Sequence, residues 1–212
     1  MLDAARKYSV ESVIVSSVKK DHQALIKKIE DALNLQVVDF NQAEIGKYGS
    51  RILYQGGVGP DRIAAYIGAE EAFPSVAKLI ADAGTALTLD VADSDGKFCG
   101  GSISLGLNSR LKDLAGATSL LPEVGFTGNY VSFGHSTEEA ITSGAVNGII
   151  GEIFYAEYRA KKEYKVEMTV LTGGDAEFFY ETVFHDYPDY VCDPRLVTRG
   201  LNRHLRTFYS YL

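Results

Sequence analysis

The sequence has few cysteines and no long apolar run. Its two cysteines among 212 residues, Cys99 and Cys192, lack the close spacing typical of metal ligands, so we expect two reduced thiols. No stretch reaches the roughly 20 consecutive apolar residues that a transmembrane helix requires, and the N-terminal residues show no apolar signal region. We therefore expect a cytoplasmic protein that does not contact membranes.

The sequence also lacks an excess of basic residues. It has 28 acidic against 21 basic side chains, a net charge of -7 and a pI near 5.1. An acidic surface repels the phosphates of DNA and RNA, so we expect no nucleic-acid partner. Hydrophobic residues make up 46% of the chain, enough to form a core without disulfides or metals.

Short apolar runs rich in β-branched residues alternate with segments of helical periodicity, which predicts an α/β fold. We expect strands at residues 11–18, 35–40, 76–81, 85–91, 97–104, 166–172 and 190–192. We expect helices at residues 2–7, 22–33, 61–71, 109–115, 136–162, 175–183 and 197–205. Asp21 is expected to cap the second helix, and the glycines Gly144, Gly148 and Gly151 to interrupt the long one.

An acidic residue and a glycine turn join two of these strands. Asp82 ends the first strand, Gly84 allows close backbone approach, and the Thr85 hydroxyl and neighbouring amides would face a bound phosphate. The alternative is an ordinary hairpin with a solvated carboxylate. The paired glycines Gly100 and Gly101 on the next strand favour the phosphate site, because glycines within a strand indicate close backbone approach.

A second motif, Gly59-Pro60-Asp61-Arg62, begins a predicted helix. Asp61 can be a helix cap beside a surface arginine. Alternatively, Asp61 is a general base, and Arg62 is a cation that binds an anionic group. The residue types alone leave both interpretations open.

Two further turns lead into helices. Gly173 and Gly174 connect a strand to a helix beginning near Asp175, where helix-terminal amides can meet a nucleotide or serve only as a turn. Before the long helix, Ser136 or Thr137 is expected to be the N-cap, with Glu139 completing a capping box.

In their order along the chain, these motifs resemble those of type III pantothenate kinases. The matching segments are GPDR at 59–62, DAGTALT at 82–88, DGKFCGGSISLG at 95–106, HSTEEAITSG at 135–144 and TGGDA at 172–176. The resemblance runs from about Val13 to Leu201. It implies an actin-like fold of two ribonuclease H-like domains. We expect the first domain, residues 1–75, to be N-terminally truncated, and the second to span residues 76–212, with the C-terminal helix packing back on the first.

The resemblance also implies ATP-dependent phosphorylation of pantothenate by a homodimer, with Mg²⁺ and a monovalent cation, K⁺ or NH₄⁺. Asp61 would accept the proton of the substrate hydroxyl, and Asp82 would bind the monovalent cation. The remaining implied contacts are with pantothenate, from Gly59, Pro60, Arg62 and Thr137, and with the nucleotide, from Gly84, Thr85, Gly173, Gly174 and Asp175.

The sequence departs from the family pattern in three places. The family's DxGN phosphate loop does not occur, YQGGV at 54–58 replaces Tyr-x-Asn-Pro, and Leu105 stands where proline is usual. A non-catalytic relative that binds a nucleotide or acts in regulation, as a transcription accessory factor, is therefore the alternative to a kinase. An unrelated actin-like kinase for another small alcohol is a third.

Overall fold

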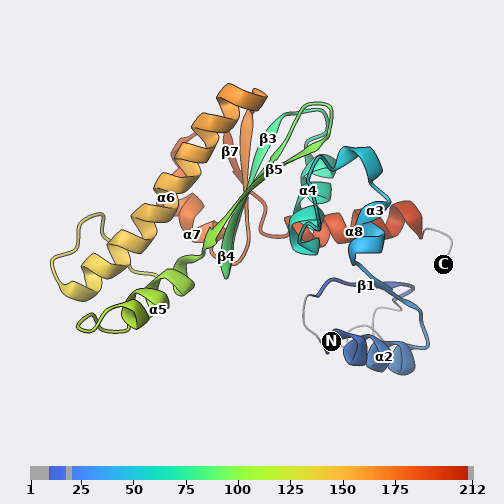
Figure 1. Ribbon diagram of the computed structural model, residues 1–212, viewed down its shortest axis with the longest axis horizontal. Helices are drawn as coiled ribbons and strands as arrows, with labels where there is room; N and C mark the ends of the chain where they lie inside the picture. Colours follow the sequence, from blue (N-terminus) through green and yellow to red (C-terminus); the bar gives the residue numbers. More distant parts are fainter. Residues whose placement is uncertain (1–9, 18–20, 210–212) are drawn as a thin grey trace.

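The computed structural model describes residues 10–17 and 21–209, and these form an α/β fold (Figure 1). The strands are β1 (Val13–Val15), β2 (Val37–Asp39), β3 (Lys78–Ala83), β4 (Ala86–Ala92), β5 (Phe98–Leu105), β6 (Met168–Thr172) and β7 (Tyr190–Cys192). The α-helices are α2 (His22–Leu33), α3 (Gln42–Gly46), α4 (Pro60–Ala72), α5 (Leu107–Ala117), α6 (Thr137–Tyr164), α7 (Ala176–Thr182) and α8 (Leu196–Phe208). Two 3₁₀ turns, η1 (Gly49–Arg51) and η2 (Phe184–Asp186), complete the set.

The strands form two sheets. β1 and β2 are parallel and make a two-stranded sheet against α2, whereas the main sheet has the order β5-β4-β3-β6-β7. In the main sheet β4 runs antiparallel to both neighbours, and β3, β6 and β7 are parallel. This order, with the second strand reversed, is that of ribonuclease H-like domains. The predicted α/β, ribonuclease H-like fold class is therefore confirmed.

Helices cover both faces of the main sheet (Figure 1). On one face, α6 packs Val146, Ile149 and Ile153 against a cluster that includes Leu79 and Ala81 of β3. Ile80 lies between Leu79 and Ala81 on β3 and points to the other face of the sheet. There it packs in one cluster with residues of α4 and α8. Alternate residues of a strand point to opposite faces, so β3 contributes to both cores.

Glycines bring α4 and α8 into close contact. A Cβ at Gly68 would lie 2.1 Å from the carbonyl oxygen of Leu196, and one at Gly200 would lie 1.8 Å from that of Ala64. The two backbones therefore touch, and α4 is buried over most of its length. This packing fixes the direction of α4 and the position of its first turn.

Most predicted elements are found with shifted ends, but two details are wrong. α6 is one continuous helix through its three glycines, because Val146, Ile149 and Ile153 bury its inner side against the sheet. Asp21 makes no side-chain capping hydrogen bond. The helix predicted at residues 2–7 lies outside the described residues. Of the helices that the structure describes, none is long and apolar enough to cross a membrane.

Candidate active site

Four polar side chains interrupt the apolar α4 face of the main sheet. In the strand register, Asp82 lies opposite Thr88 on β4 and Thr172 on β6, and Asp90 lies opposite Ile80. Paired residues share a face, so all four belong to the face on which Ile80 meets α4. Asp90, Thr88 and Thr172 are buried. Buried polar groups need hydrogen-bond partners. The first turn of α4 supplies a partner for Asp90, namely Arg62.

Arg62 forms a buried ion pair with Asp90. Its Nε donates to Asp90 Oδ2 at 3.0 Å and its Nη2 donates to Oδ1 at 2.5 Å. The guanidinium carbon also lies 5.3 Å from the Tyr54 ring centroid and 5.6 Å from that of Phe98. These hydrogen bonds to Asp90 raise the pKa of Arg62. The surface-arginine interpretation is wrong, because Arg62 is only 5% exposed.

Asp61 lies in the first turn of α4 and is exposed. Gly59 is the N-cap and Pro60 the first helical residue, so Asp61 is not the capping residue. Its Oδ1 nevertheless accepts a hydrogen bond from the Arg62 amide at 2.9 Å. A Cβ at Gly59 would lie 2.5 Å from the same oxygen, so glycine leaves room for this carboxylate. A solvent-facing carboxylate held this way can receive a proton from a bound alcohol.

Asp82 has a perturbed acidity. Burial raises its pKa to about 6, and the negative charges of Asp61 and Asp90 act in the same direction. The three carboxylates therefore interact, with Arg62 as a nearby cation paired to one of them. A carboxyl group with a strongly shifted pKa that lies beside groups of like charge is typical of functional sites.

The TGGDA turn packs directly on the DAGT turn. The Asp175 amide donates to the Ala83 carbonyl at 2.9 Å. Gly173 has a φ of +96°, and a Cβ there would lie 2.4 Å from both Ala83 O and Asp82 Oδ1. The structure thus brings Asp175, Gly173 and Gly174 together with Asp82.

The turn at Gly84 is closed by its own hydrogen bonds. The Gly84 amide donates to Ala86 O at 3.0 Å, and the Gly106 amide donates to Thr85 O at 3.1 Å. The Gly84 amide is therefore occupied, and a phosphate at this turn would contact the exposed Thr85 side chain instead. Burial raises the pKa of Asp175 on the adjoining turn.

Thr137 lies apart from these residues. It begins α6, which covers the face of the sheet opposite α4, and its side chain lines a largely apolar groove between α5 and α6. The predicted N-cap is present, since Ser136 Oγ accepts from the Glu139 amide at 3.2 Å, but the capping box is not completed, because the Glu139 side chain accepts from the His135 amide instead of the Ser136 amide. The structure therefore does not bring Thr137 to Asp61 within one chain.

Asp90 and Thr172 belong to this site, although neither was predicted as a site residue from the sequence. A charged residue inside an otherwise apolar strand was the available signal for Asp90, because such a residue needs a buried partner. Thr172 Oγ1 is buried without a hydrogen-bond partner, beside Asp82 in the strand register. Among the described residues, no group of three or more His, Cys, Asp or Glu side chains is placed to hold a metal ion.

The ribonuclease H-like strand order, with acidic and glycine turns meeting at one end of the sheet, defines a protein of the actin-like class. A comparison with protein families narrows this class. The family described as type III pantothenate kinase matches residues 1–157. The chain belongs to the type III pantothenate kinase family, which confirms the resemblance found in the sequence.

Curated relatives named type III pantothenate kinase support this assignment. The protein of Porphyromonas gingivalis is 38% identical over 151 residues, covering 69% of this chain and 60% of its own. That of Bacteroides fragilis is 40% identical over 146 residues, covering 69% and 59%. That of Flavobacterium johnsoniae is 34% identical over 168 residues, covering 78% and 67%. The chain thus spans about 60% of the length of the first two of these relatives.

A solved structure with the same fold comes from Campylobacter jejuni and is described as a conserved protein of the Baf family of transcriptional activators. It covers 97% of this chain and 87% of its own, with a TM-score of 0.61 and 20% identity. At this identity the likeness concerns the fold alone.

Proposed function

We propose that this chain transfers phosphate from ATP to pantothenate, the first step of coenzyme A synthesis. The observation that carries the proposal is the meeting of two family motifs in one acidic site, where Arg62 of GPDR, next to Asp61, pairs with Asp90 on the same sheet face as Asp82 of DAGT. Family membership gives the substrates, and the geometry supports roles for these residues. Phosphoryl transfer depends mainly on positioning and charge neutralisation, which such a site can supply.

In this proposal Asp61 receives the proton of the pantothenate hydroxyl. The ion pair with Asp90 holds the Arg62 side chain, and α4 is fixed against α8, so the carboxylate of Asp61 stays in place. Gly59 and Pro60 shape the start of the helix beside the substrate. Asp61 is exposed, so it is accessible to an incoming alcohol.

The nucleotide is proposed to lie along the two packed turns, near Thr85, Gly173, Gly174 and Asp175. Mg²⁺ would neutralise charge on the transferred phosphate, and it is commonly held by substrate phosphates with few protein carboxylates. A monovalent cation is proposed beside Asp82, because burial and the charges of Asp61 and Asp90 disfavour the ionised carboxylate, and a bound cation would compensate its charge. The unpartnered Thr172 hydroxyl offers a second oxygen at this position.

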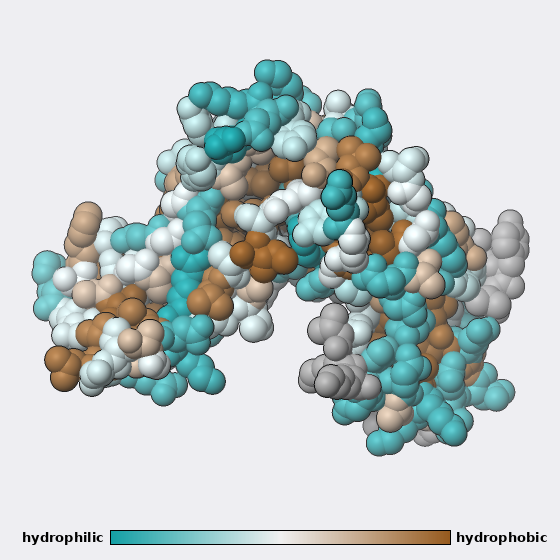
Figure 2. All heavy atoms as spheres, viewed as in Figure 1, coloured by the Kyte–Doolittle hydropathy of each residue, from teal (hydrophilic) through white to brown (hydrophobic). Residues whose placement is uncertain are grey.

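We also propose a cytoplasmic homodimer. Figure 2 shows apolar atoms gathered at the end of the molecule formed by α5 and the start of α6, where Leu120 and Phe133 are exposed. Large exposed apolar side chains favour association. Thr137 belongs to this end, so any contact it makes with pantothenate would be in the site of a second copy. The division into units 1–75 and 76–212 is kept as part of the proposal, with α8 returning to pack on α4, although α4 also shares a core with Ile80 of the main sheet.

A coupled ADP-release assay with pantothenate, ATP, Mg²⁺ and K⁺ tests this function. We expect turnover that Asp61→Asn lowers by at least about 100-fold, a size typical of losing a general base. The matched control is Asp95→Asn, an exposed carboxylate in the β4–β5 turn, which should keep wild-type activity. A chain that binds ATP and pantothenate without turnover would favour the non-catalytic alternative, and full activity of Asp61→Asn would remove its role as base.

A further inference from the structure

A polar cavity of about 510 Å³ lies at the other end of α4 from the candidate active site. It is bounded by Tyr48 and Arg51 after α3, by Tyr66 and Glu70 of α4, and by Arg203 of α8. Glu70 follows Asp61 by more than two helical turns, or about 14 Å along the axis. The cavity is therefore separate from the residues assigned to pantothenate and ATP.

The acidic side chains of this cavity have basic partners of their own, although Glu71 Oε2 is buried without a hydrogen-bond partner. Each has a basic partner: Glu70 pairs with Lys78, Glu71 with Arg206 at 2.5 Å, and Asp95 with Lys97 at 3.4 Å. Lys47, a cation of the lining, pairs in turn with Glu44 at 2.8 Å. Within residues 10–17 and 21–209, neither Arg51 nor Arg203 has an ion-pair partner. The cavity thus carries two uncompensated guanidinium groups.

Both arginines line the same cavity as Tyr48. Burial raises the pKa of Tyr48 to about 12, and the charges of Arg203 and Arg51 oppose that rise. Tyr48 is held in place because its hydroxyl bonds His204 Nδ1 at 2.9 Å. The other ring nitrogen of His204 lies 2.7 Å from Glu44 Oε2.

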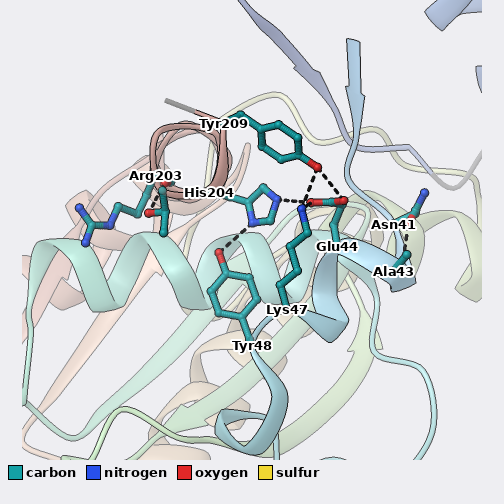
Figure 3. Close-up of polar contacts among 9 residues, drawn as sticks. Asn41, Ala43, Glu44, Lys47, Tyr48, Arg203, His204 and Tyr209 are labelled. Carbon is teal, nitrogen blue, oxygen red and sulfur yellow. Dashed lines mark hydrogen bonds and ion pairs between the residues drawn. The ribbon is translucent and has the colours of Figure 1, made fainter. Parts of the chain in front are cut away.

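Arg203 takes no part in this network. Figure 3 shows its guanidinium pointing away from the cluster of Glu44, His204, Lys47 and Tyr209. The cluster anchors α8 to the segment after α3, and so fixes the backbones that carry Arg203 and Arg51. Arg51 and Arg203 are exposed side chains on anchored backbones, and both line one cavity with the anchored Tyr48.

We propose that this cavity binds a small phosphate-bearing molecule with at least two negative charges. Guanidinium groups donate paired hydrogen bonds that match phosphate oxygens, and arginine is preferred over lysine for this purpose. The Tyr48 and Tyr66 rings on the lining offer apolar area for the rest of the ligand. This second site requires neither the kinase activity nor the residues of the candidate active site.

The probe for this site is inorganic pyrophosphate, followed by two-dimensional NMR of the arginine Nε–Hε groups. Arg51→Gln and Arg203→Gln assign the two signals, and Arg195→Gln assigns a control arginine that is exposed at the start of α8. We expect the Arg51 and Arg203 signals to shift together and to saturate with one dissociation constant. The Arg195 signal should follow only the change in ionic strength.

Calorimetric titration of the same variants gives the affinity. Losing one charge-assisted pair should weaken pyrophosphate binding at least about tenfold, whereas Arg195→Gln should bind as wild type does. Citrate, an anion of similar charge without phosphate, should bind more weakly. Unsaturating shifts, an affinity that neither substitution changes, or equal binding of citrate would overturn the proposal. The NMR signals of Arg51 and Arg203 report binding at this cavity and not at the Thr85 turn. The kinase assay measures turnover at the candidate active site, so this proposal and the proposed function can fail separately.

Discussion

Replacing Asp90 by asparagine tests the buried ion pair that fixes the start of α4. Asp90 is 1% exposed and receives hydrogen bonds from both Nε and Nη2 of Arg62. Asparagine keeps the shape but removes the charge, which leaves the Arg62 guanidinium buried without compensation. Breaking a buried pair in this way costs about 3–5 kcal/mol.

Thermal unfolding followed by circular dichroism measures this loss. For a chain of 212 residues, where 1 kcal/mol corresponds to roughly 2–4 °C, the melting temperature should fall by about 6–20 °C. Asp95→Asn is again the matched control, because Asp95 is 73% exposed and its pair with Lys97 should contribute no more than about 1 kcal/mol.

The double variant Arg62→Met with Asp90→Leu separates the charge from the packing. Removing both charges leaves no uncompensated group, so this variant should be more stable than Asp90→Asn alone. The reasoning would be refuted if Asp90→Asn were as stable as Asp95→Asn, or if the double variant were less stable than Asp90→Asn.

Two further predictions concern the turns of the site. The folded-state pKa of Asp82, about 6, lies above the value near 3.9 expected when unfolded, so this carboxyl lowers stability as pH rises from about 4 through 6. Asp82→Asn should therefore resist urea better than wild type at pH 8 and equally well near pH 4. K⁺ should reduce the stability difference between the two proteins at pH 8. Identical urea unfolding curves for variant and wild type at both pH values would contradict the raised pKa of Asp82. Gly173→Ala should lose about 1–3 kcal/mol in urea unfolding, because φ is +96° and the Cβ meets Ala83 O, whereas the control Gly174→Ala, with nothing within 4 Å, should lose less. Equal losses for the two glycine variants would show that the packing of the turns is not what requires Gly173.

Local patterns predicted most of the elements. The apolar strands at 76–81 and 166–172 and the helix at 22–33 are found because their periodicity matches the faces that they bury. The N-cap at Ser136 was predictable, since its side chain and the Glu139 amide are three residues apart and interact within one turn. Helix propensity misled at the glycines of α6, where burial against the sheet outweighs the local preference.

Contacts between distant segments were not predictable in the same way. The pairing of Arg62 with Asp90 depends on the register of β3 and β4 and on α4 lying over that face, neither of which a local pattern contains. The cavity between Arg51 and Arg203 likewise exists only because α8 returns to α4. The grouping of Asp61, Asp82 and TGGDA was anticipated through the family resemblance; the Asp175–Ala83 hydrogen bond joins TGGDA to the Asp82 turn, and the Arg62–Asp90 pair joins the start of α4 to the same sheet.

The central claim is that the acidic site carrying Asp61 transfers phosphate to pantothenate. Its most direct test is ³¹P NMR of the chain mixed with ATP, Mg²⁺, K⁺ and pantothenate. The account predicts a new phosphomonoester signal that matches authentic 4'-phosphopantothenate, present with wild type and Asp95→Asn and missing with Asp61→Asn. ATP consumption without this phosphomonoester, or its equal formation by Asp61→Asn, would contradict the account.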